Sequence, residues 1–338
     1  MLPLIKEPLM QLEAEAQQDI IERILQLKKQ KNVLILGHNY MHPLVYQLSD
    51  ADARGDSLGL SMYAARATNP IILFDGVLFM AETAKILNPD KKILIADKTA
   101  GCSLADPIRA ADVIALKQQY PGVPVVTYVN SYADVKAKSD YCCTSANALK
   151  IILAIGKPKI IFLPDSLMGE NLQNELNRMG KKIELIYPGK GNKLKRGMCE
   201  VHDKFTLEDI RMVRKNYDIP KGHPTRAVLV HWECRPDVVK EADFCGSTTQ
   251  MAQYIKEKKP EKVFLATECE MAANLSMEFP ATEFIRQCNV YCQHMRKITL
   301  PKILSALETE DVEKHEVFVD EEIRKKALIP IQKMLEIG

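Results

Sequence analysis

A threefold internal repeat is the feature that most constrains how this chain can fold. Each repeat opens with an apolar run rich in Val, Leu and Ile that ends in polar residues: 32–40, 123–131 and 226–234. A polar turn, an amphipathic segment and a second apolar run follow, the second runs being 71–75, 159–165 and 262–268. Apolar strands that alternate with amphipathic helices predict parallel sheets with helices on their faces.

Each repeat also ends in a cysteine. Cys102, Cys199 and Cys292 follow the aligned residues Met80, Met168 and Met271 by 22, 31 and 21 residues, and the middle repeat carries the basic insertion KGNKLKRG. Ligands of parallel sheets gather at the carboxyl ends of the strands, so three such units can direct their cysteines to one centre. The sequence therefore predicts an α/β fold of three pseudo-threefold-related αβα domains around a central active site.

The same repeat predicts the domain limits. The first domain comprises residues 1–112 together with a C-terminal helical tail, residues 301–338. The second comprises residues 113–205 and the third residues 206–300. Each domain would then contribute one terminal cysteine to the centre.

The nine cysteines favour metal or thiol chemistry over a disulfide framework. Their number is odd, and no C-x-x-C pair of the kind used by zinc ribbons and ferredoxins occurs. Three matched cysteines without an equivalent fourth fit a [4Fe-4S] cluster in which one iron lacks a protein thiolate and acts as a Lewis acid. The alternative is that all nine are small buried apolar side chains.

Polar pairs stand where the three opening runs end. They are His38 and Tyr40, Tyr128 and Asn130, and His231 and Glu233. Members of a pair are two residues apart and would share one face of a strand, and His, Tyr and Glu are common acid–base groups. The alternative for each is a strand-end side chain bonded to a loop.

Hydroxyl residues precede the helical segments and predict anion binding. Ser57, Ser145, Ser247 and Thr248 are expected helix N-caps, where free backbone N–H groups bind carboxylates or phosphate. Ordinary capping without a ligand is compatible with the same pattern.

Charge and hydropathy exclude two classes of partner. The 46 basic and 44 acidic side chains give a formal net charge of +2, without the basic surface that nucleic acid or an anionic membrane requires. No apolar stretch reaches the roughly 20 residues that span a bilayer. Charged residues near the start, such as Lys6 and Glu7, replace the apolar core of a signal peptide. We therefore expect a cytoplasmic protein.

Several longer motifs resemble those of the quinolinate synthase family, over nearly all of residues 20–310. They are GDSLGL, GVLFMAETAKIL, AGCSLAD, YVNS, CCTSANA, GMCEVH, HWECRPDV, ADFCGST and CQHMRKITLPKI. The resemblance implies a cytoplasmic transferase of NAD biosynthesis that condenses iminoaspartate with dihydroxyacetone phosphate, losing phosphate and water, to give quinolinate. Contact with an aspartate-oxidising enzyme would supply the unstable iminoaspartate.

The resemblance also implies roles for individual residues. The [4Fe-4S] cluster, one per chain, would be bound by Cys102, Cys199 and Cys292, with its open iron facing the substrate. Acid–base work would fall to His38, Tyr40 and Glu233. Substrate binding would involve His38, Ser57, Tyr128, Asn130, Ser145, His202, His231, Glu233, Ser247 and Thr248.

Three positions depart from the family pattern. The run GHNYMHP replaces a commoner one but keeps His38 and Tyr40, and Glu270 stands where a glycine is usual. Cys288 lies four residues before Cys292, where some members carry a longer cysteine series. The first change leaves the predicted site intact, whereas Glu270 would alter the local turn or add a carboxylate.

Two other functional classes fit the sequence less well. A nicotinamide-dependent oxidoreductase needs G-x-G-x-x-G after its first strand, whereas the corresponding turns read GHNYMHP, YVNSYAD and HWECRPD. A passive small-molecule binder has no use for matched cysteines at the ends of its repeats. The cysteines thus favour a cluster-bearing enzyme.

Overall fold

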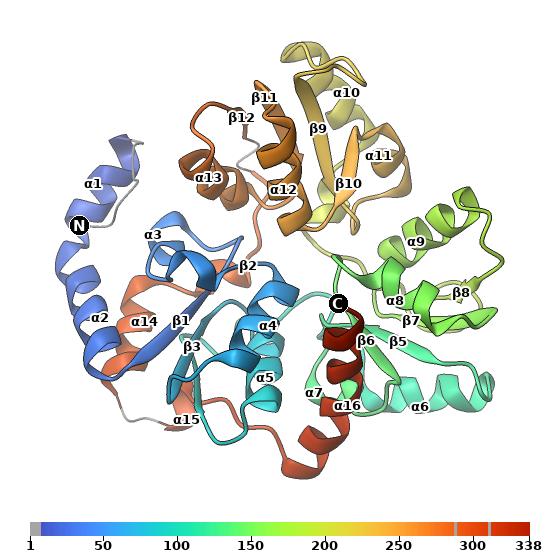
Figure 1. Ribbon diagram of the computed structural model, residues 1–338, viewed down its shortest axis with the longest axis horizontal. Coiled ribbons are helices and arrows are strands. Elements are labelled where there is room, and N and C mark those ends of the chain that lie inside the picture. Colours follow the sequence, from blue (N-terminus) through green and yellow to red (C-terminus); the bar gives the residue numbers. More distant parts are fainter. Residues whose placement is uncertain (1–7, 287–288, 310–311) are drawn as a thin grey trace.

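The chain forms three four-stranded parallel sheets arranged around a common centre (Figure 1). A computed structural model describes residues 8–286, 289–309 and 312–338. The strand orders are β2-β1-β3-β4, β6-β5-β7-β8 and β10-β9-β11-β12, so one topology occurs three times. The predicted α/β fold of three αβα units is confirmed.

The first unit takes its strands and helices from the N-terminal third of the chain. Its strands are β1 (Val33–His38), β2 (Arg54–Gly55), β3 (Ile71–Asp75) and β4 (Lys92–Ile95). Its helices are α3 (Pro43–Tyr46), α4 (Ser57–Arg66) and α5 (Leu78–Leu87), with a 3-10 turn η1 (Ala51–Ala53).

The second and third units repeat this plan with additional helices. The second has β5 (Val125–Tyr128), β6 (Tyr141–Cys143), β7 (Lys159–Leu163), β8 (Glu184–Ile186), α6 (Ala110–Gln119), α7 (Ala133–Lys136), α8 (Ala148–Ile155), α9 (Ser166–Arg178) and η2 (His202–Lys204). The third has β9 (Arg226–His231), β10 (Phe244–Gly246), β11 (Lys262–Ala266), β12 (Glu283–Ile285), α10 (Leu207–Asn216), α11 (Pro236–Glu241), α12 (Thr248–Lys258), α13 (Cys269–Glu278) and η3 (Met295–Lys297).

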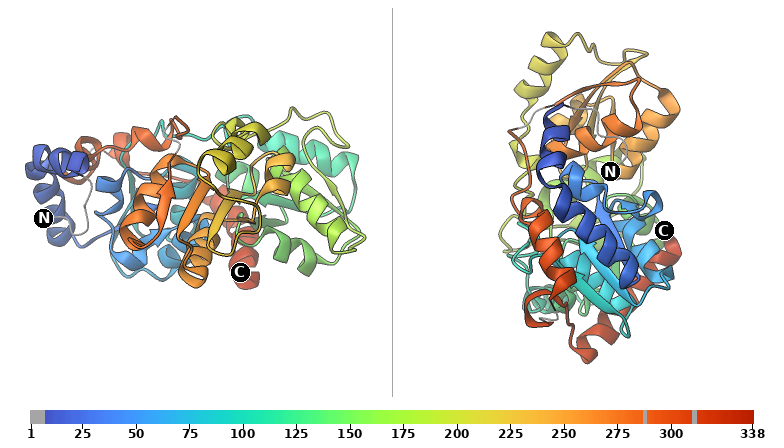
Figure 2. Two further views of the ribbon diagram at one scale, coloured as in Figure 1. Left: turned by 90° about the horizontal axis from the view of Figure 1, so that it is seen from above. Right: turned by 90° about the vertical axis from the view of Figure 1, so that its left-hand side faces the viewer.

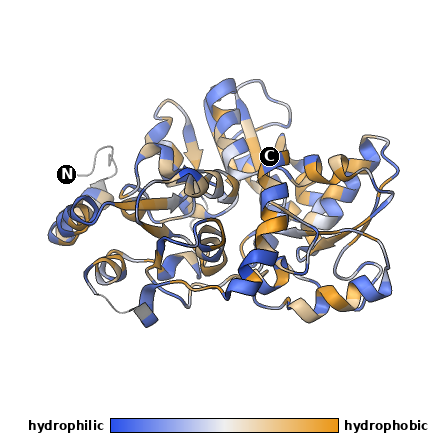
Figure 3. Cartoon of the chain, turned by 60° about the horizontal axis from the view of Figure 1, so that its bottom comes forward, coloured by the Kyte–Doolittle hydropathy of each residue, from blue (hydrophilic) through white to orange (hydrophobic). Residues whose placement is uncertain are grey.

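The sheets are buried on both faces, as their continuous apolar runs predict. In β9, Val228 and Val230 belong to one apolar cluster, and Ala227 and Leu229 belong to another. This alternation follows from the two-residue period of a strand. The strands are correspondingly hydrophobic in Figure 3, while many helices carry hydrophilic residues on their outer sides.

Helices from the two ends of the chain complete the molecule. They are α1 (Pro8–Ala16), α2 (Gln18–Gln30), α14 (Leu300–Glu308), α15 (Val312–His315) and α16 (Glu321–Ile337). Helix α14 packs against α2, whereas α16 contacts α5 of the first unit and α7, α8 and β6 of the second. Figure 2 shows α1 and α2 at one end of the flattened molecule. None of the helices in the described ranges is both long and apolar enough to cross a bilayer.

The opening strands are shorter than the apolar runs suggested. His38, Tyr128 and His231 are the last residues of β1, β5 and β9, so the second member of each polar pair lies in a turn and not on the strand. In two units the histidine closes this turn, because its Nδ1 accepts the N–H of Tyr40 at 3.2 Å or of Glu233 at 3.3 Å. The expected sharing of a strand face is wrong, although each pair still points to the centre.

Candidate active site

The carboxyl ends of the three sheets open on one cavity that is partly continuous with solvent. All the predicted site residues except Ser247 line it: His38, Tyr40, Ser57, Cys102, Tyr128, Asn130, Ser145, Cys199, His202, His231, Glu233, Thr248 and Cys292. Ser247 is buried beside the cavity and donates its hydroxyl hydrogen to Asp56 Oδ2 at 3.0 Å. Residues from all three units therefore share one site.

The three cysteines stand in loops that the backbone holds in the same way. The carbonyl two residues before each cysteine accepts the first N–H of α5, α9 or α13: Leu78 to Ala100 at 2.8 Å, Ser166 to Gly197 at 2.8 Å and Cys269 to Val290 at 3.0 Å. The carbonyl of each cysteine accepts the N–H four residues later, from Asp106, Asp203 or Arg296 at 2.9, 3.0 and 3.1 Å. The three thiols are thus presented by equivalent turns.

Burial and backbone donors act on the thiols in opposite directions. Burial raises the pKa of Cys102 and of Cys292 to about 12, and it raises the pKa of Cys199 well above the ordinary thiol value. Backbone N–H groups two or three residues later lower these pKa values, because they hydrogen-bond the sulfur; for Cys199 the donor is His202. The metal-free thiols are therefore protonated near neutral pH, yet each turn is prepared to stabilise a thiolate.

The possible metal ligands comprise one compact group and three cysteines that line the same cavity. Among the residues that the structure describes, Cys199, His202 and Glu233 have donor atoms within 4.8 Å of one another, and this compact group contains one cysteine only. All three cysteines nevertheless line the cavity, and burial together with the charges of Glu233, Cys102 and Cys292 raises the pKa of Cys199. Three thiolates spread around one cavity match the ligands of an iron–sulfur cluster, so the residues present fit such a group.

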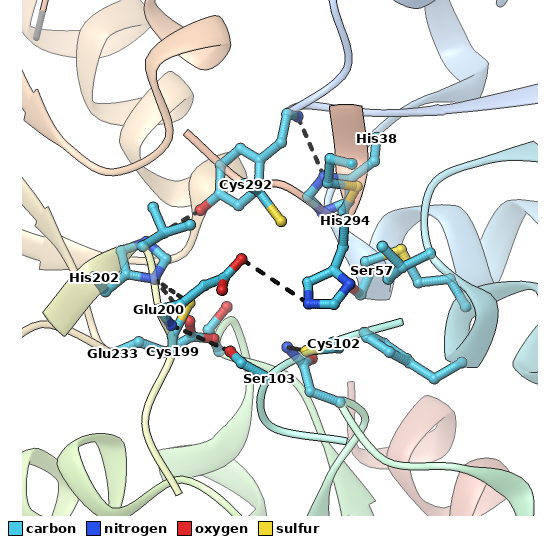
Figure 4. A pocket seen from close by; sticks show the side chains of 18 of the residues that line it. His38, Ser57, Cys102, Ser103, Cys199, Glu200, His202, Glu233, Cys292 and His294 are labelled. Carbon is cyan, nitrogen blue, oxygen red and sulfur yellow. Dashed lines mark hydrogen bonds and ion pairs between the residues drawn. The ribbon is translucent and has the colours of Figure 1, made fainter. Parts of the chain in front are cut away.

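Glu233 is the point where side chains of the second and third units converge. The Tyr128 hydroxyl donates to Glu233 Oε1 at 2.6 Å. His202 Nδ1 lies 2.7 Å from Glu233 Oε2 and 3.2 Å from Cys199 Sγ, and Figure 4 shows this group beside the cysteine. The carboxylate therefore links a predicted metal ligand to an acid–base cluster.

Tyr40 of the first unit joins this cluster through Thr267. The Tyr40 hydroxyl lies 2.5 Å from Thr267 Oγ1, which lies 2.9 Å from His202 Nε2. His202 stacks on His231 with ring centroids 4.4 Å apart, and His231 Nε2 lies 3.2 Å from Ser145 Oγ. Protons can thus be exchanged along the hydrogen-bonded series Tyr40, Thr267, His202, Glu233 and Tyr128, whereas His231 joins His202 by stacking.

Burial and neighbouring charges shift the pKa values of these groups and so set which of them are protonated near pH 7. Burial lowers the pKa of His38 to about 4 and that of His231 to about 3, so both imidazoles are neutral near pH 7. Burial and the charge of Glu233 raise the pKa of Tyr40 and Tyr128 well above the ordinary phenol value. Burial opposes ionisation of Glu233, but the neighbouring histidines and the hydrogen bonds from His202 and Tyr128 hold its pKa well below the usual range.

Of the four hydroxyl residues that were expected to be helix N-caps, only Ser247 is one. Ser247 caps α12 by accepting the N–H of Gln250, whereas Asp56 caps α4 by accepting the N–H of Gly59. Ser57 is the first residue of its helix, and Ser145 precedes the N-cap Asn147 by two residues. A carboxylate is as good a cap as a hydroxyl, which explains the error. Ser57, Ser145 and Thr248 nonetheless face the cavity from the starts of three helices.

Several residues of the cavity were not predicted from the sequence. Asp56, Ser103, Glu200 and His294 line the cavity, and Thr267 bonds two site residues. Ser103 and Glu200 directly follow predicted metal ligands, and His294 comes two residues after Cys292; this proximity was the available signal.

The departures from the expected motif pattern have little effect on the cavity. Glu270 does not line it: the Glu270 side chain lies 3.5 Å from Arg296, and its N–H donates to Glu268 at 2.6 Å. Cys288 lies outside the described residues. His38 and Tyr40 of the altered GHNYMHP run both face the cavity.

The known proteins that are similar to this chain belong to one family. The family model described as quinolinate synthetase A protein (NadA) matches residues 22–336. Quinolinate synthase 2 of Mesorhizobium japonicum is 47% identical over 317 residues, covering 94% of this chain and 91% of the relative. Quinolinate synthases of Agrobacterium fabrum and Xylella fastidiosa are 46% and 45% identical, covering 95% and 94% of this chain and 86% and 87% of the relatives. The chain belongs to the quinolinate synthetase A family.

Proposed function

We propose that this enzyme condenses iminoaspartate with dihydroxyacetone phosphate and releases quinolinate, phosphate and water, in the cytoplasm, as a step of NAD biosynthesis. Family membership supports this reaction. The observation that carries the proposal is the single cavity in which three equivalent cysteine turns meet an acid–base cluster. A passive binding protein would need neither.

Cys102, Cys199 and Cys292 would bind one [4Fe-4S] cluster. When bound, a cluster with an iron free of protein thiolate supplies a Lewis acid for a hydroxyl or carboxylate of the substrate. His202 lies between Cys199 and Glu233, so it positions the thiol and the carboxylate relative to each other. The backbone N–H groups of the three turns stabilise the thiolates.

The reaction requires carbon–carbon bond formation, loss of phosphate, a ketose–aldose isomerisation, imine closure and dehydration. Burial keeps the pKa of His38 near 4 and its Nδ1 accepts the N–H of Tyr40, so the neutral ring carries its hydrogen on Nε2 and donates it to a substrate oxygen. Tyr40 stays protonated and donates a proton or a hydrogen bond to a substrate oxygen. Glu233 stays ionised and accepts hydrogen bonds from the substrate amine or hydroxyl groups.

Anionic substrate groups would bind where helices begin. Ser57 and Thr248 are the first residues of α4 and α12, and both line the cavity. Free N–H groups at a helix start attract carboxylates and phosphate. Tyr128, Asn130, Ser145, His202 and His231 would complete the contacts to the substrates and intermediates.

Three further features belong to the proposal. The functional domains comprise residues 1–112 with 301–338, residues 113–205 and residues 206–300. Iminoaspartate hydrolyses in water, so transient contact with an aspartate-oxidising enzyme would deliver it before it decays. Neither nucleic acid nor a membrane takes part.

Anaerobic purification followed by iron and sulfide analysis tests the proposal. About four irons and four sulfides per chain are expected, together with quinolinate formation from the two substrates. Both should be absent from a Cys102→Ala, Cys199→Ala, Cys292→Ala variant and retained by Cys245→Ala, whose side chain does not line the cavity. A wild-type chain that stays colourless after anaerobic reconstitution would contradict the proposal.

A further inference from the structure

The three cysteine loops are connected to one another as well as to their own units. The first connection joins the loops of Cys102 and Cys199. The N–H of Glu200 donates to Ser103 Oγ at 3.1 Å, and the Ser103 hydroxyl lies 3.4 Å from the Met198 carbonyl, to which it donates. Ser103 therefore links the residues on both sides of Cys199 to the first loop.

Two more connections join the loop of Cys292 to the loops of Cys199 and Cys102. His294 Nε2, in the loop of Cys292, lies 3.9 Å from Glu200 Oε1, and Figure 4 shows this contact crossing the view between the three labelled cysteines. Lys297 Nζ donates to the Thr99 carbonyl at 2.6 Å and to its hydroxyl at 3.2 Å, which joins the third loop to the first. Each loop thus contacts both of the others.

These contacts have a different role from the backbone bonds described above. The bonds to Ala100, Gly197 and Val290 fix each loop to its own unit, and they leave the distances between units free. A cluster bound by one cysteine from each unit is lost when the loops separate. Contacts between the loops oppose that separation at the cysteines themselves, in addition to the contacts that join the units elsewhere.

We infer that the contacts made by Ser103, Glu200, His294 and Lys297 form a closed ring that holds the cysteine loops in register and slows the loss of the bound iron–sulfur group. This inference rests on the proposed function. In this role the four are positioning residues, because they act on the bound group through the loops. The Glu200–His294 contact is the longest of the three connections, and the carboxylate oxygen that it uses has no hydrogen-bond partner among the described residues. It is therefore the connection at which the ring opens first.

A ring makes a specific prediction about combined substitutions. When one connection of a three-membered ring is broken, the loops remain connected in a line, so each single substitution has a moderate effect. When two are broken, one loop is released from both neighbours, so the effect exceeds the product of the single effects. If the contacts were independent, the effects of the single substitutions on the release rate would instead multiply.

The experiment follows iron release to a ferrous chelator from the full chain carrying its reconstituted cluster, by loss of visible absorbance under anaerobic conditions. Ser103→Ala and Lys297→Met should each accelerate release about fivefold, the weight of one hydrogen bond. His294→Leu removes only an ion-pair contact of 3.9 Å and should accelerate release by less. Two double variants release one loop each: Ser103→Ala with Lys297→Met, and His294→Leu with Lys297→Met. The first should exceed the product of its single effects, about 25-fold, and the second should exceed the smaller product of its own single effects.

Controls separate positioning from general stability. Ser103→Thr and Lys297→Arg keep the donor groups and should restore slow release, and exposed Lys256→Met should leave it unchanged. Melting temperatures of the cluster-free variants should stay within about 4 °C of the wild type. Unchanged release, or double effects no larger than the product, would overturn the ring. A wild-type chain that binds no cluster would overturn the proposed function and the ring with it.

Discussion

Glu233 shows how one side chain can depend on residues far away in the sequence. It lies just beyond β9, yet its carboxylate oxygens are held by Tyr128 at the end of β5 and by His202 in η2. Burial alone would favour the neutral acid, and the surrounding donors reverse that preference. Its charge in turn raises the pKa values of Tyr40 and Tyr128, in addition to the effect of burial.

Glu233→Gln is expected to keep the shape of this residue and remove its charge. Quinolinate formation should fall by about 10² or more, because the ionised acceptor of the acid–base cluster is lost. The measurement is the steady-state rate with iron content determined in parallel. Glu257→Gln, on the exposed face of α12, is the matched control. A variant with full activity would rule out a role for the charge.

Asp75 carries a different kind of buried carboxyl group. It ends β3, it is fully buried, and neither oxygen has a hydrogen-bond partner within the described residues. Burial raises its pKa well above the ordinary value of 3.8, against the opposing charge of Lys28. Leu163 and Ala266 end the corresponding strands of the other units, so the repeat itself suggests an apolar replacement.

Asp75→Leu should therefore change how stability depends on pH. The folded state keeps a proton that the unfolded state releases, so the free energy of unfolding of the wild type falls as pH rises from 3.8 towards the raised pKa. The slope in that range is about 1.4 kcal/mol per pH unit. Urea unfolding at about pH 5 and about pH 8 should show the advantage of the variant growing with pH. Asp75→Asn should remove the same slope, whereas a constant difference would contradict the assignment.

The cysteine loops illustrate how elements constrain one another. Gly197 lies two residues before Cys199, and its carbonyl accepts the first N–H of α9. A Cβ at Gly197 would lie 2.5 Å from the carbonyl oxygen of Pro164, which is backbone and cannot move aside. The corresponding residues Ala100 and Val290 carry a Cβ, so the close approach is peculiar to the second unit.

Gly197→Ala is accordingly expected to displace the loop of Cys199. We expect a loss of about 1–3 kcal/mol in the free energy of unfolding, with fewer irons per chain after reconstitution. Gly59→Ala is the control, since its Cβ would come no closer than 3.5 Å to Asp56 Oδ1 and alanine favours a helix. Equal iron content in both variants would show that the close contact does not fix the loop.

The sequence predicted elements better than it predicted contacts. The strands and the cysteine positions were accessible because burial and repetition leave a periodic signal along the chain. The cap of α4 was assigned to Ser57 instead of Asp56, since the two stand side by side and both residue types cap helices. Glu200 and His294 were missed because their contact joins two units, and nothing local in the sequence encodes how units face each other.

At the scale of the whole molecule, the three units are not equally connected. Strands β1, β3, β5 and β7 contribute to one apolar cluster, whereas the third sheet has separate clusters on its two faces. Hydrogen bonds join the third unit to the first, including Asn39 Nδ2 to Thr248 Oγ1 at 2.8 Å and Asn274 Nδ2 to the Asn39 carbonyl at 3.0 Å. Helix α16 reinforces the connection between the first two units only.

Native-state hydrogen exchange should reveal this difference. The amides of β9 and β11 are expected to open with a free energy at least about 1 kcal/mol below that of β1 and β3, because the third unit unfolds as its own cooperative group. The measurement is exchange resolved by peptide or residue under native conditions. Uniform protection across the three sheets would show that the polar contacts couple the units as strongly as a shared core.

The central cavity also limits when the chain can acquire metal during its synthesis. Its walls come from all three units, and its three cysteines are spread from residue 102 to residue 292. As the chain leaves the ribosome, the third wall is added after the other two, and α14 and α16, which pack on the first unit, follow it. On the proposed function, iron would consequently be loaded after translation. A prematurely terminated chain would lack the third cysteine, so iron would be committed only to chains that have been synthesised and folded through to the last unit.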